Sequence, residues 1–323
     1  GLKYLKDYKN LNLKKIPSSP LIKSNVLKLL LSVSIIVYSI LKSLLFLLFN
    51  RPSIIIGMGG YSSFPICFAA SILKINFVIY ENNLIVGKAN KYLLPFAKKI
   101  FVSHEEIEGI SAKYSNKVCK IGNIIREEII KDNNKDGQID NYDDLRVLVL
   151  GGSQAAKVFA EELPQIFERL KKSNIPIKVY QQCQENQNNY LSKFYKKSNI
   201  DYKIFNFTDR IIDYYSKVNL VITRSGASVL GELINVKIPF ISIPLPSSAD
   251  NHQYKNAEFY FKKGCGYLLE ETDIKAKLFD LINSIFNDKS LIKNILSKQR
   301  QYSDKDIFKN LNVQIEEILN EKN

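Results

Sequence analysis

The sequence is poor in cysteine and histidine, the side chains that most often bind zinc or form disulfides. It contains four cysteines and two histidines among 323 residues. The cysteines stand far apart, without a C-x-x-C pair or a histidine cluster, at Cys67, Cys119, Cys183 and Cys265. Scattered thiols of this kind argue against a zinc site and against a disulfide framework, and they favour a reducing cytoplasm.

Arginine is also scarce, although the chain is strongly basic. The formal net charge is +14, yet only seven of the basic residues are arginines. A positive chain attracts anionic partners such as a membrane surface, a nucleotide or nucleic acid, while a lysine-rich composition can equally reflect base composition. No nucleic-acid-binding motif accompanies the charge, so we do not expect nucleic acid as a partner.

Hairpin signals are absent too, because strand-like and helix-like segments alternate instead. Short apolar runs are each followed by a loop and a helical stretch between residues 53 and 103, and the pattern restarts at Arg146 after the polar linker 131–144. This alternation predicts an α/β fold with doubly wound parallel sheets, and the length allows two domains. The glycine loop at 57–60 does not read G-x-G-x-x-G, so a nicotinamide site is poorly supported and a plain tight turn remains open.

The most apolar stretch, residues 26–49, is long enough to cross a bilayer. Its polar residues Lys28, Ser32, Ser39 and Lys42 trace one stripe along a helix. We therefore expect a core helix that is buried on one side, with part of its apolar face in contact with lipid. A fully buried helix and a transmembrane helix are the alternatives.

The stretch 220–257 contains the clearest sign of a ligand site. Residues 220–223 are an apolar run typical of a buried strand, and helical spacing begins at Ser228 after a break that contains Gly226. A strand, a glycine turn and a helix start bring free backbone N–H groups and the positive helix end to one spot, which suits a phosphate. Gly226 would let a ligand approach the backbone closely.

Glu232 lies about one turn into this helix, too deep to cap it. A carboxylate beside a phosphate site often accepts hydrogen bonds from a ribose diol; a solvated helix glutamate is the alternative interpretation. Further on, Gln253 and Asn256 lie three residues apart on one predicted helix face. Uncharged amides with a neighbouring histidine suit a neutral polyol or a diphosphate better than a metal.

Four further motifs occur in a recognisable order. They are Gly57-Met58-Gly59-Gly60-Tyr61, Tyr80-Glu81-Asn82-Asn83, Gly122-Asn123 with Arg126, and Gly151-Gly152-Ser153-Gln154. Together with the stretch 220–257, the chain resembles the bacterial glycosyltransferases that add N-acetylglucosamine to undecaprenyl-pyrophosphoryl-N-acetylmuramyl-pentapeptide in peptidoglycan precursor synthesis. The resemblance covers nearly the whole chain.

The resemblance implies a GT-B fold, in which two Rossmann-like domains face each other across a cleft. It implies an N-terminal acceptor and membrane-facing domain at 1–128, a UDP-sugar-binding domain at 129–303 and a C-terminal helix at 304–323 that packs back on the first domain. The implied partners are UDP-N-acetylglucosamine, the undecaprenyl-linked muramyl-pentapeptide and the anionic surface of the cytoplasmic membrane. The enzyme would be peripheral, on the cytoplasmic face of the inner membrane, and would serve cell-wall synthesis, cell shape and cell division.

The resemblance also implies roles for individual residues. Thr208 would meet uracil through its backbone, Glu232 would hold the ribose, and backbone groups of 227–229 would meet the diphosphate. The complete implied donor site comprises Asn83, Arg126, Ser153, Thr208, Arg224, Ser225, Gly226, Ala227, Ser228, Val229, Glu232, His252 and Gln253. No D-x-D motif lies near a predicted strand end, so we expect neither a metal nor another cofactor; helix dipoles would stabilise the leaving UDP.

An inverting displacement needs a general base at the acceptor hydroxyl. The family carries its usual candidate, a histidine, in an N-terminal G-T-G-G-H loop that this chain lacks, and we interpret the chain as N-terminally truncated. Glu81 is the best-placed remaining carboxylate, whereas His104 is expected to be a surface histidine. Two alternatives remain: another GT-B lipid glycosyltransferase, and a catalytically silent, nucleotide-sugar-binding subunit at the membrane.

Overall fold

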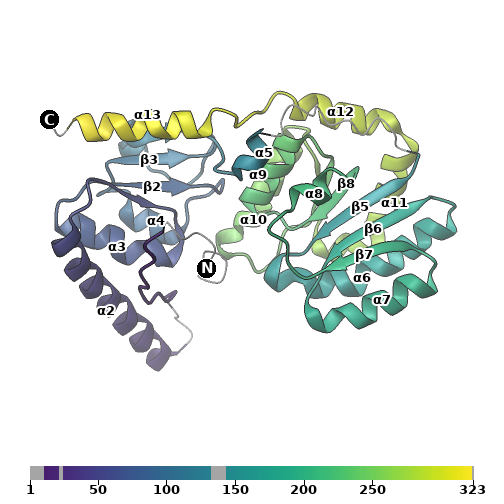
Figure 1. Cartoon of the computed structure of the whole chain (residues 1–323), viewed down its shortest axis with the longest axis horizontal. Coiled ribbons are helices and arrows are strands. Elements are labelled where there is room, and N and C mark those ends of the chain that lie inside the picture. Colours follow the sequence, from purple (N-terminus) through teal and green to yellow (C-terminus); the bar gives the residue numbers. More distant parts are fainter. Residues whose placement is uncertain (1–10, 22–24, 132–142, 322–323) are drawn as a thin grey trace.

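The chain folds into two lobes, each built on one parallel sheet (Figure 1). We describe it from a computed structural model that covers residues 11–21, 25–131 and 143–321, with only the backbone of 153–156. Most of the predicted linker 131–144 therefore lies outside the described residues. The predicted α/β architecture with two parallel-sheet domains is confirmed.

The first lobe has a four-stranded sheet in the order β1-β2-β3-β4. Its strands are β1 (Ile55–Gly57), β2 (Phe77–Glu81), β3 (Lys99–Val102) and β4 (Val118–Lys120). Its helices are α2 (Val26–Asn50), α3 (Gly60–Ile72), α4 (Lys88–Leu93) and the 3₁₀ helix η1 (Ala112–Lys117). The next helix, α5 (Glu127–Lys131), already packs beside α9 in the core of the second lobe.

The second lobe has a six-stranded sheet in the order β10-β9-β8-β5-β6-β7. Its strands are β5 (Leu145–Leu150), β6 (Ile177–Gln182), β7 (Asp201–Phe205), β8 (Leu220–Thr223), β9 (Phe240–Ser242) and β10 (Tyr267–Leu268). Its α-helices are α6 (Gly152–Lys172), α7 (Asn188–Lys197), α8 (Ile212–Tyr215), α9 (Ala227–Val236), α10 (His252–Lys262), α11 (Ile274–Asn287) and α12 (Lys289–Gln299), and its 3₁₀ helices are η3 (Glu185–Gln187), η4 (Ala249–Asn251) and η5 (Glu271–Asp273).

Both faces of the second sheet are covered, as the continuous apolar strands predict. Along β5, Val147 and Val149 pack into the core formed with α6 and α11, whereas Leu148 and Leu150 pack into the core on the opposite face, beside α9. Alternate side chains of one strand therefore hold helices on both sides. This packing fixes where α9 begins relative to the ends of β5 and β8.

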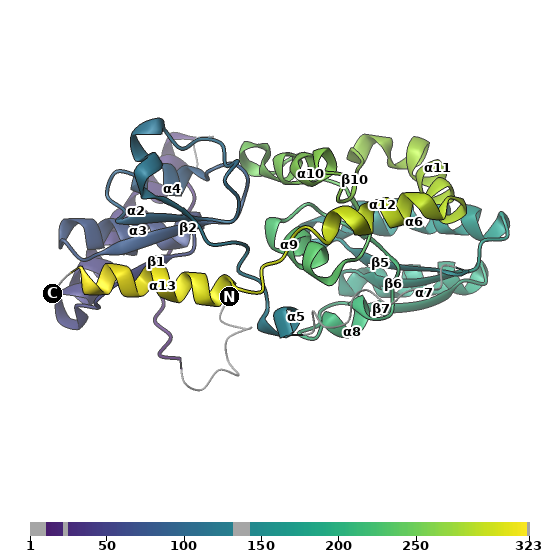
Figure 2. The same cartoon turned by 90° about the horizontal axis from the view of Figure 1, so that it is seen from above.

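The last helix, α13 (Ile307–Asn320), leaves the second lobe and lies along the first sheet (Figures 1 and 2). Ile307 and Ile318 are buried in one cluster with Val78 and Phe101, and Lys99 donates a hydrogen bond of 2.6 Å to Glu317. The chain thus passes between the lobes twice, after β4 and after α12. The predicted domain boundaries at 128/129 and 303/304 stay a prediction.

Helix α2 is oriented differently from our expectation. We expected Lys28, Ser32, Ser39 and Lys42 to form one polar face of the helix. In the structure the serines Ser32, Ser39 and Ser43 are buried, whereas the two lysines are exposed. Small serines let the helix approach the protein closely, and each hydroxyl is satisfied by a backbone carbonyl, as in the 2.7 Å bond from Ser43 Oγ to Ser39 O. Many apolar side chains of α2 consequently point outward, although Leu47 is buried. Within the described residues α2 is the helix long and apolar enough to cross a membrane, and only 17% of its most apolar window is buried.

His104 is not a surface residue, which corrects our expectation. It follows β3, is buried, and its Nε2 lies 3.0 Å from the hydroxyl of Tyr260 on α10 in the second lobe. Its ring also packs against Phe259, with centroids 4.6 Å apart. Burial lowers the pKa of His104 to about 4, so the imidazole is neutral between the two lobes at neutral pH.

Candidate functional site

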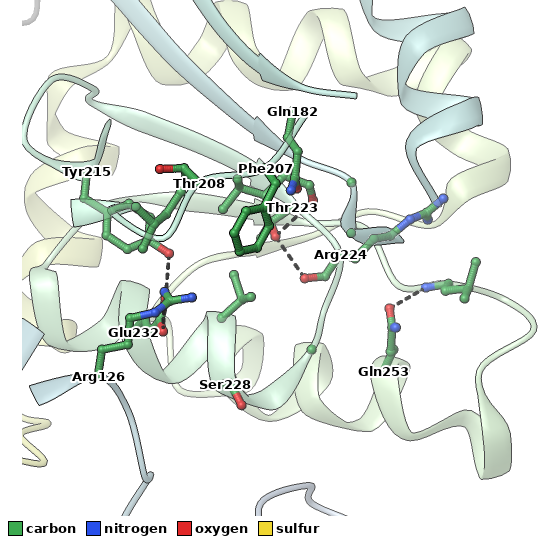
Figure 3. Close-up of a pocket in the computed structure, with 17 residues that line it drawn as sticks. Arg126, Gln182, Phe207, Thr208, Tyr215, Thr223, Arg224, Ser228, Glu232 and Gln253 are labelled. Carbon is green, nitrogen blue, oxygen red and sulfur yellow. Dashed lines mark hydrogen bonds and ion pairs between the residues drawn. The ribbon is translucent and has the colours of Figure 1, made fainter. Parts of the chain in front are cut away.

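A cavity of about 430 Å³ opens at the carboxyl ends of β5, β6 and β8 (Figure 3). In open parallel sheets this edge is where ligands bind. The cavity is lined by the turn after β5, the loop between β7 and α8, the start of α9, and Arg126 from the first crossing between the lobes. It therefore lies where the two lobes meet.

The start of α9 forms one wall of the cavity. Gly226 is the N-cap residue and no side chain caps the helix, so the first backbone N–H groups of α9 have no partner within it. Gly226, Ser228 and Val229 line the cavity, and a Cβ placed on Gly226 would meet no atom within 4 Å. The backbone amides and the positive helix end consequently face open space, which is the arrangement that suits a phosphate.

Glu232 is the one acid among the described residues that line the cavity. Its carboxylate is buried and accepts hydrogen bonds from Arg126 Nη1 at 2.9 and 3.0 Å and from the Tyr215 hydroxyl at 3.0 Å. Burial raises the pKa of Glu232, while the charge of Arg126 and the bond from Tyr215 oppose that rise. The alternative of a solvated helix glutamate is wrong, because the side chain faces the cavity within a network of donors (Figure 3).

Arg224 and Ser225 have a different environment from the one predicted. The Arg224 guanidinium is buried, forms an ion pair with Glu271, and donates to the carbonyls of Ile243 and Pro244 at 3.2 and 3.1 Å. Its charge is already neutralised, so it anchors the turn before α9 to the end of β9. Ser225 is also buried and does not line the cavity. The structure therefore does not support side-chain contacts of these two residues with a donor.

Glu81 lies at the end of β2, where the sequence predicts a catalytic residue, but its carboxylate is fully engaged. Oε1 accepts from the backbone N–H and the Nδ2 of Asn83 at 3.1 and 2.9 Å. Oε2 accepts from the backbone N–H of Gly87 and from Asn90 Nδ2 at 3.0 and 2.9 Å. Four donors occupy the lone pairs of the two carboxylate oxygens and leave none directed at a substrate. Glu81 holds the loop after β2 in shape, which argues against its predicted role as the general base.

This loop is joined to the second lobe by a buried amide, Asn256 of α10. Asn256 accepts from the backbone N–H of Leu84 at 2.9 Å and donates to Asn83 Oδ1 and to the Ser225 carbonyl, both at 3.1 Å. Beside it, Asn82 Nδ2 donates to Ser228 Oγ at 3.1 Å. Asn83 and Ser228 thus belong to the contact between the lobes, at the edge of the cavity.

Of the remaining predicted residues, some line the cavity and others do not. Thr208 and Gln253 line the cavity, and Gln253 Oε1 accepts from the backbone N–H of Leu245 at 2.9 Å. Ala227 is buried in the first turn of α9, and His252 lies outside the lining, with Nδ1 2.7 Å from the Ala249 carbonyl. The side chain of Ser153 lies outside the described part of the chain.

Tyr215 and Phe207 are among the cavity residues that were not predicted from the sequence. Tyr215 ends α8 and reaches Glu232 from the neighbouring element, while Phe207 stands exposed in the loop before α8. Neither belongs to a glycine turn or a charged pair, so the sequence contains no local signal for them. Only the packing of α8 beside α9 brings Tyr215 to the acid.

Comparisons with known proteins identify both halves of the chain. Residues 146–311 match the glycosyltransferase family 28 C-terminal domain, and residues 3–102 match the glycosyltransferase family 28 N-terminal domain. A protein of Pelagibacter ubique (strain HTCC1062), named UDP-N-acetylglucosamine–N-acetylmuramyl-(pentapeptide) pyrophosphoryl-undecaprenol N-acetylglucosamine transferase, is 36% identical over 99% of this chain and 89% of its own length. A protein of the same name from Rickettsia felis is 36% identical over 81% of this chain and 76% of its own length.

Solved structures show the same architecture. The crystal structure of Acinetobacter baumannii MurG superimposes with a TM-score of 0.75 at 22% identity, covering 98% of this chain and 87% of that one. A UDP-GlcNAc 2-epimerase from Neisseria meningitidis bound to UDP-GlcNAc superimposes with a TM-score of 0.62 at 13% identity, covering 95% and 84%. At these identities the structural likeness shows the fold alone.

Proposed function

Because this chain belongs to glycosyltransferase family 28, among the UDP-N-acetylglucosamine–N-acetylmuramyl-(pentapeptide) pyrophosphoryl-undecaprenol N-acetylglucosamine transferases, we propose that it transfers N-acetylglucosamine from UDP-N-acetylglucosamine to the 4-hydroxyl of the lipid-linked muramyl sugar. The reaction belongs to peptidoglycan precursor synthesis and so contributes to cell shape and division. The observation that carries the proposal is the cavity in which the free amides of α9 and one buried acid face the same space.

In our proposal the donor has a single orientation in this cavity. The diphosphate lies against the backbone N–H groups of Ala227, Ser228 and Val229, and the ribose hydroxyls donate to Glu232, about one turn further along α9. Uracil then reaches the backbone of Thr208, and the sugar points toward Gln253 and the loop after β2. Both Thr208 and Gln253 line the same cavity.

The amides of α9 also stabilise the leaving group. As the bond from the anomeric carbon to the diphosphate breaks in an inverting displacement, negative charge develops on the UDP oxygen. Fixed N–H dipoles that already point at this position stabilise the charge without reorganisation. Glu81 keeps the loop after β2 in place for the acceptor rather than taking the proton, because its lone pairs are in use.

The acceptor is attached to a lipid, and α2 offers a surface for a membrane. Its outward side chains are apolar and exposed, among them Leu27, Leu30, Leu31, Val37, Leu41, Leu45, Leu48 and Phe49. Lys28 and Lys42 are exposed on the same helix, and the chain carries a net charge of +14. An apolar face with basic neighbours binds anionic bilayers from the side. The enzyme would accordingly lie on the cytoplasmic face of the inner membrane as a peripheral protein.

Substitution of one outward leucine tests the membrane surface. Leu45→Asn should weaken binding to vesicles that contain anionic phospholipid about fivefold, since partial burial of a leucine contributes on the order of 1 kcal/mol. Val313→Asn removes an exposed apolar side chain from α13 instead of α2 and serves as the control; Val313 is 44% exposed and Leu45 is 59% exposed. Equal vesicle binding of both variants in a sedimentation assay would refute the role of α2.

The function itself is tested by sugar transfer. The protein is incubated with radiolabelled UDP-N-acetylglucosamine and a lipid-linked muramyl-pentapeptide pyrophosphate, and label in the lipid product is counted. We expect N-acetylglucosamine to be transferred in preference to glucose or galactose from their UDP derivatives. Preferred transfer of another sugar, or of N-acetylglucosamine to diacylglycerol, would overturn the proposal.

A further inference from the structure

Arg126 occupies the Glu232 carboxylate, the group to which the proposed ribose would bind. One nitrogen, Nη1, lies 2.9 Å from Glu232 Oε1 and 3.0 Å from Oε2, and the Tyr215 hydroxyl donates to Oε2 at 3.0 Å. A carboxylate offers about four lone-pair positions, two on each oxygen. The present contacts use one on Oε1 and both on Oε2, so only one position is left for a diol that donates two hydrogen bonds. The ribose and Arg126 therefore compete for Glu232.

The burial of the two donors indicates which of them moves. Tyr215 is 3% exposed and is fixed in the core beside α9, whereas the side chain of Arg126 is 46% exposed. Arg126 lies on the crossing between β4 and α5, next to Ile125, which packs into the core of the second lobe beside α9. Displacement of Arg126 leaves the hydrophobic core intact, whereas displacement of Tyr215 would disrupt it.

At the other end of the donor, the charge of the diphosphate would be stabilised further by a cation beside the amides of α9. Arg126 and Arg224 are the basic side chains among the described residues that line the cavity, and Arg224 is already paired with Glu271. A diphosphate at the start of α9 would therefore meet amides but no uncommitted positive side chain other than Arg126. An arginine released from Glu232 lies in the same cavity as that diphosphate and can donate to two of its oxygens.

We propose that donor binding exchanges the partner of Arg126: the ribose takes its place on Glu232, and the freed guanidinium binds the diphosphate. This inference rests on the proposed function, because it requires a ribose and a phosphate in the cavity. The exchange predicts that Arg126 weakens the binding of the ribose, with which it competes, and strengthens the binding of the diphosphate.

The exchange also acts on the connection between the lobes. Asp304, on the second crossing, accepts from Asn123 Nδ2 at 3.0 Å and from Asn235 Nδ2 at 2.7 Å, so it ties both crossings to α9. The bond between Arg126 and Glu232 is a second tie between the first crossing and α9. Donor binding replaces the direct second tie by one that runs from Arg126 through the diphosphate to α9, and it leaves the first tie unchanged.

Binding of uridine and of UDP to an Arg126→Gln variant tests the exchange, because uridine contains the ribose without the phosphates. We expect uridine to bind about threefold more tightly than to the wild type, since its competitor is gone, and UDP to bind about tenfold more weakly. Burial raises the pKa of Glu232 and Arg126 opposes this, so the titrations are run at pH 8 to keep the carboxylate ionised in every variant.

Two further variants make the result decisive. Tyr215→Phe removes a donor that does not exchange and should change uridine and UDP affinity by the same factor. Arg126→Lys should shift the two affinities in opposite directions, as the glutamine variant does but less, and it replaces that variant if glutamine prevents folding. Weaker binding of both ligands to the Arg126 variants, or no change in either, would overturn the exchange. A wild-type protein that binds neither ligand would instead overturn the proposed function.

Discussion

Replacing Glu232 by glutamine is expected to weaken the binding of UDP-N-acetylglucosamine by about 1–3 kcal/mol, the range for losing hydrogen bonds to a charged group. The carboxylate accepts from Tyr215 and Arg126 in the free protein and, in our proposal, from Tyr215 and the ribose diol once the donor is bound. A carboxamide has only one acceptor oxygen and turns an N–H₂ group toward these donors, so at least one of them loses its partner.

Titration calorimetry with UDP-N-acetylglucosamine measures this effect. Glu258→Gln on α10 is the matched control, because Glu258 pairs with Lys262 and does not line the cavity. The control should bind the donor like the wild type. An affinity of Glu232→Gln equal to that of the control would show that this acid does not hold the donor.

Acidification is expected to destabilise the protein through His104. The folded-state pKa is lowered to about 4 by burial, whereas an unfolded histidine has a pKa of about 6.5. Above pH 6.5 the imidazole is neutral in both states and contributes no pH dependence. As the pH falls from about 6.5 to about 4, only the unfolded state takes up the proton. The free energy of unfolding is therefore lower by about 2–3 kcal/mol at pH 4.5 than at pH 7.

Urea unfolding at pH 7 and pH 4.5 isolates this contribution. His104→Gln retains a polar group opposite Tyr260 and cannot titrate, while all carboxylates of the chain titrate in both proteins. The free energy of unfolding should therefore fall by about 2–3 kcal/mol more in the wild type than in the variant. An equal fall in both proteins would show that His104 is not held neutral between the lobes.

The sequence predicted those parts of the fold that depend on local patterns. Apolar runs separated by helical stretches indicated parallel sheets, because strands buried on both faces carry few polar residues. The break around Gly226 indicated the strand–turn–helix start, because a glycine between an apolar run and a helix is a local signal. The position of Glu232 about one turn further along followed from helical spacing.

The parts that depend on packing between distant segments were not predictable. The serines of α2 looked like a solvent-facing stripe, but small residues can equally permit a close helix contact, and only the position of α3 decides between the two. His104 and Arg224 are polar side chains for which burial depends on partners 156 and 47 residues away, Tyr260 and Glu271. Tyr215 reaches Glu232 only because α8 packs beside α9.

A crystal structure with saturating UDP-N-acetylglucosamine tests the account most directly. We predict ribose hydroxyls within hydrogen-bonding distance of the Glu232 carboxylate and the diphosphate on the backbone amides of Ala227, Ser228 and Val229. A nucleotide bound elsewhere, or one that meets these amides with its ribose turned away from Glu232, would contradict the account.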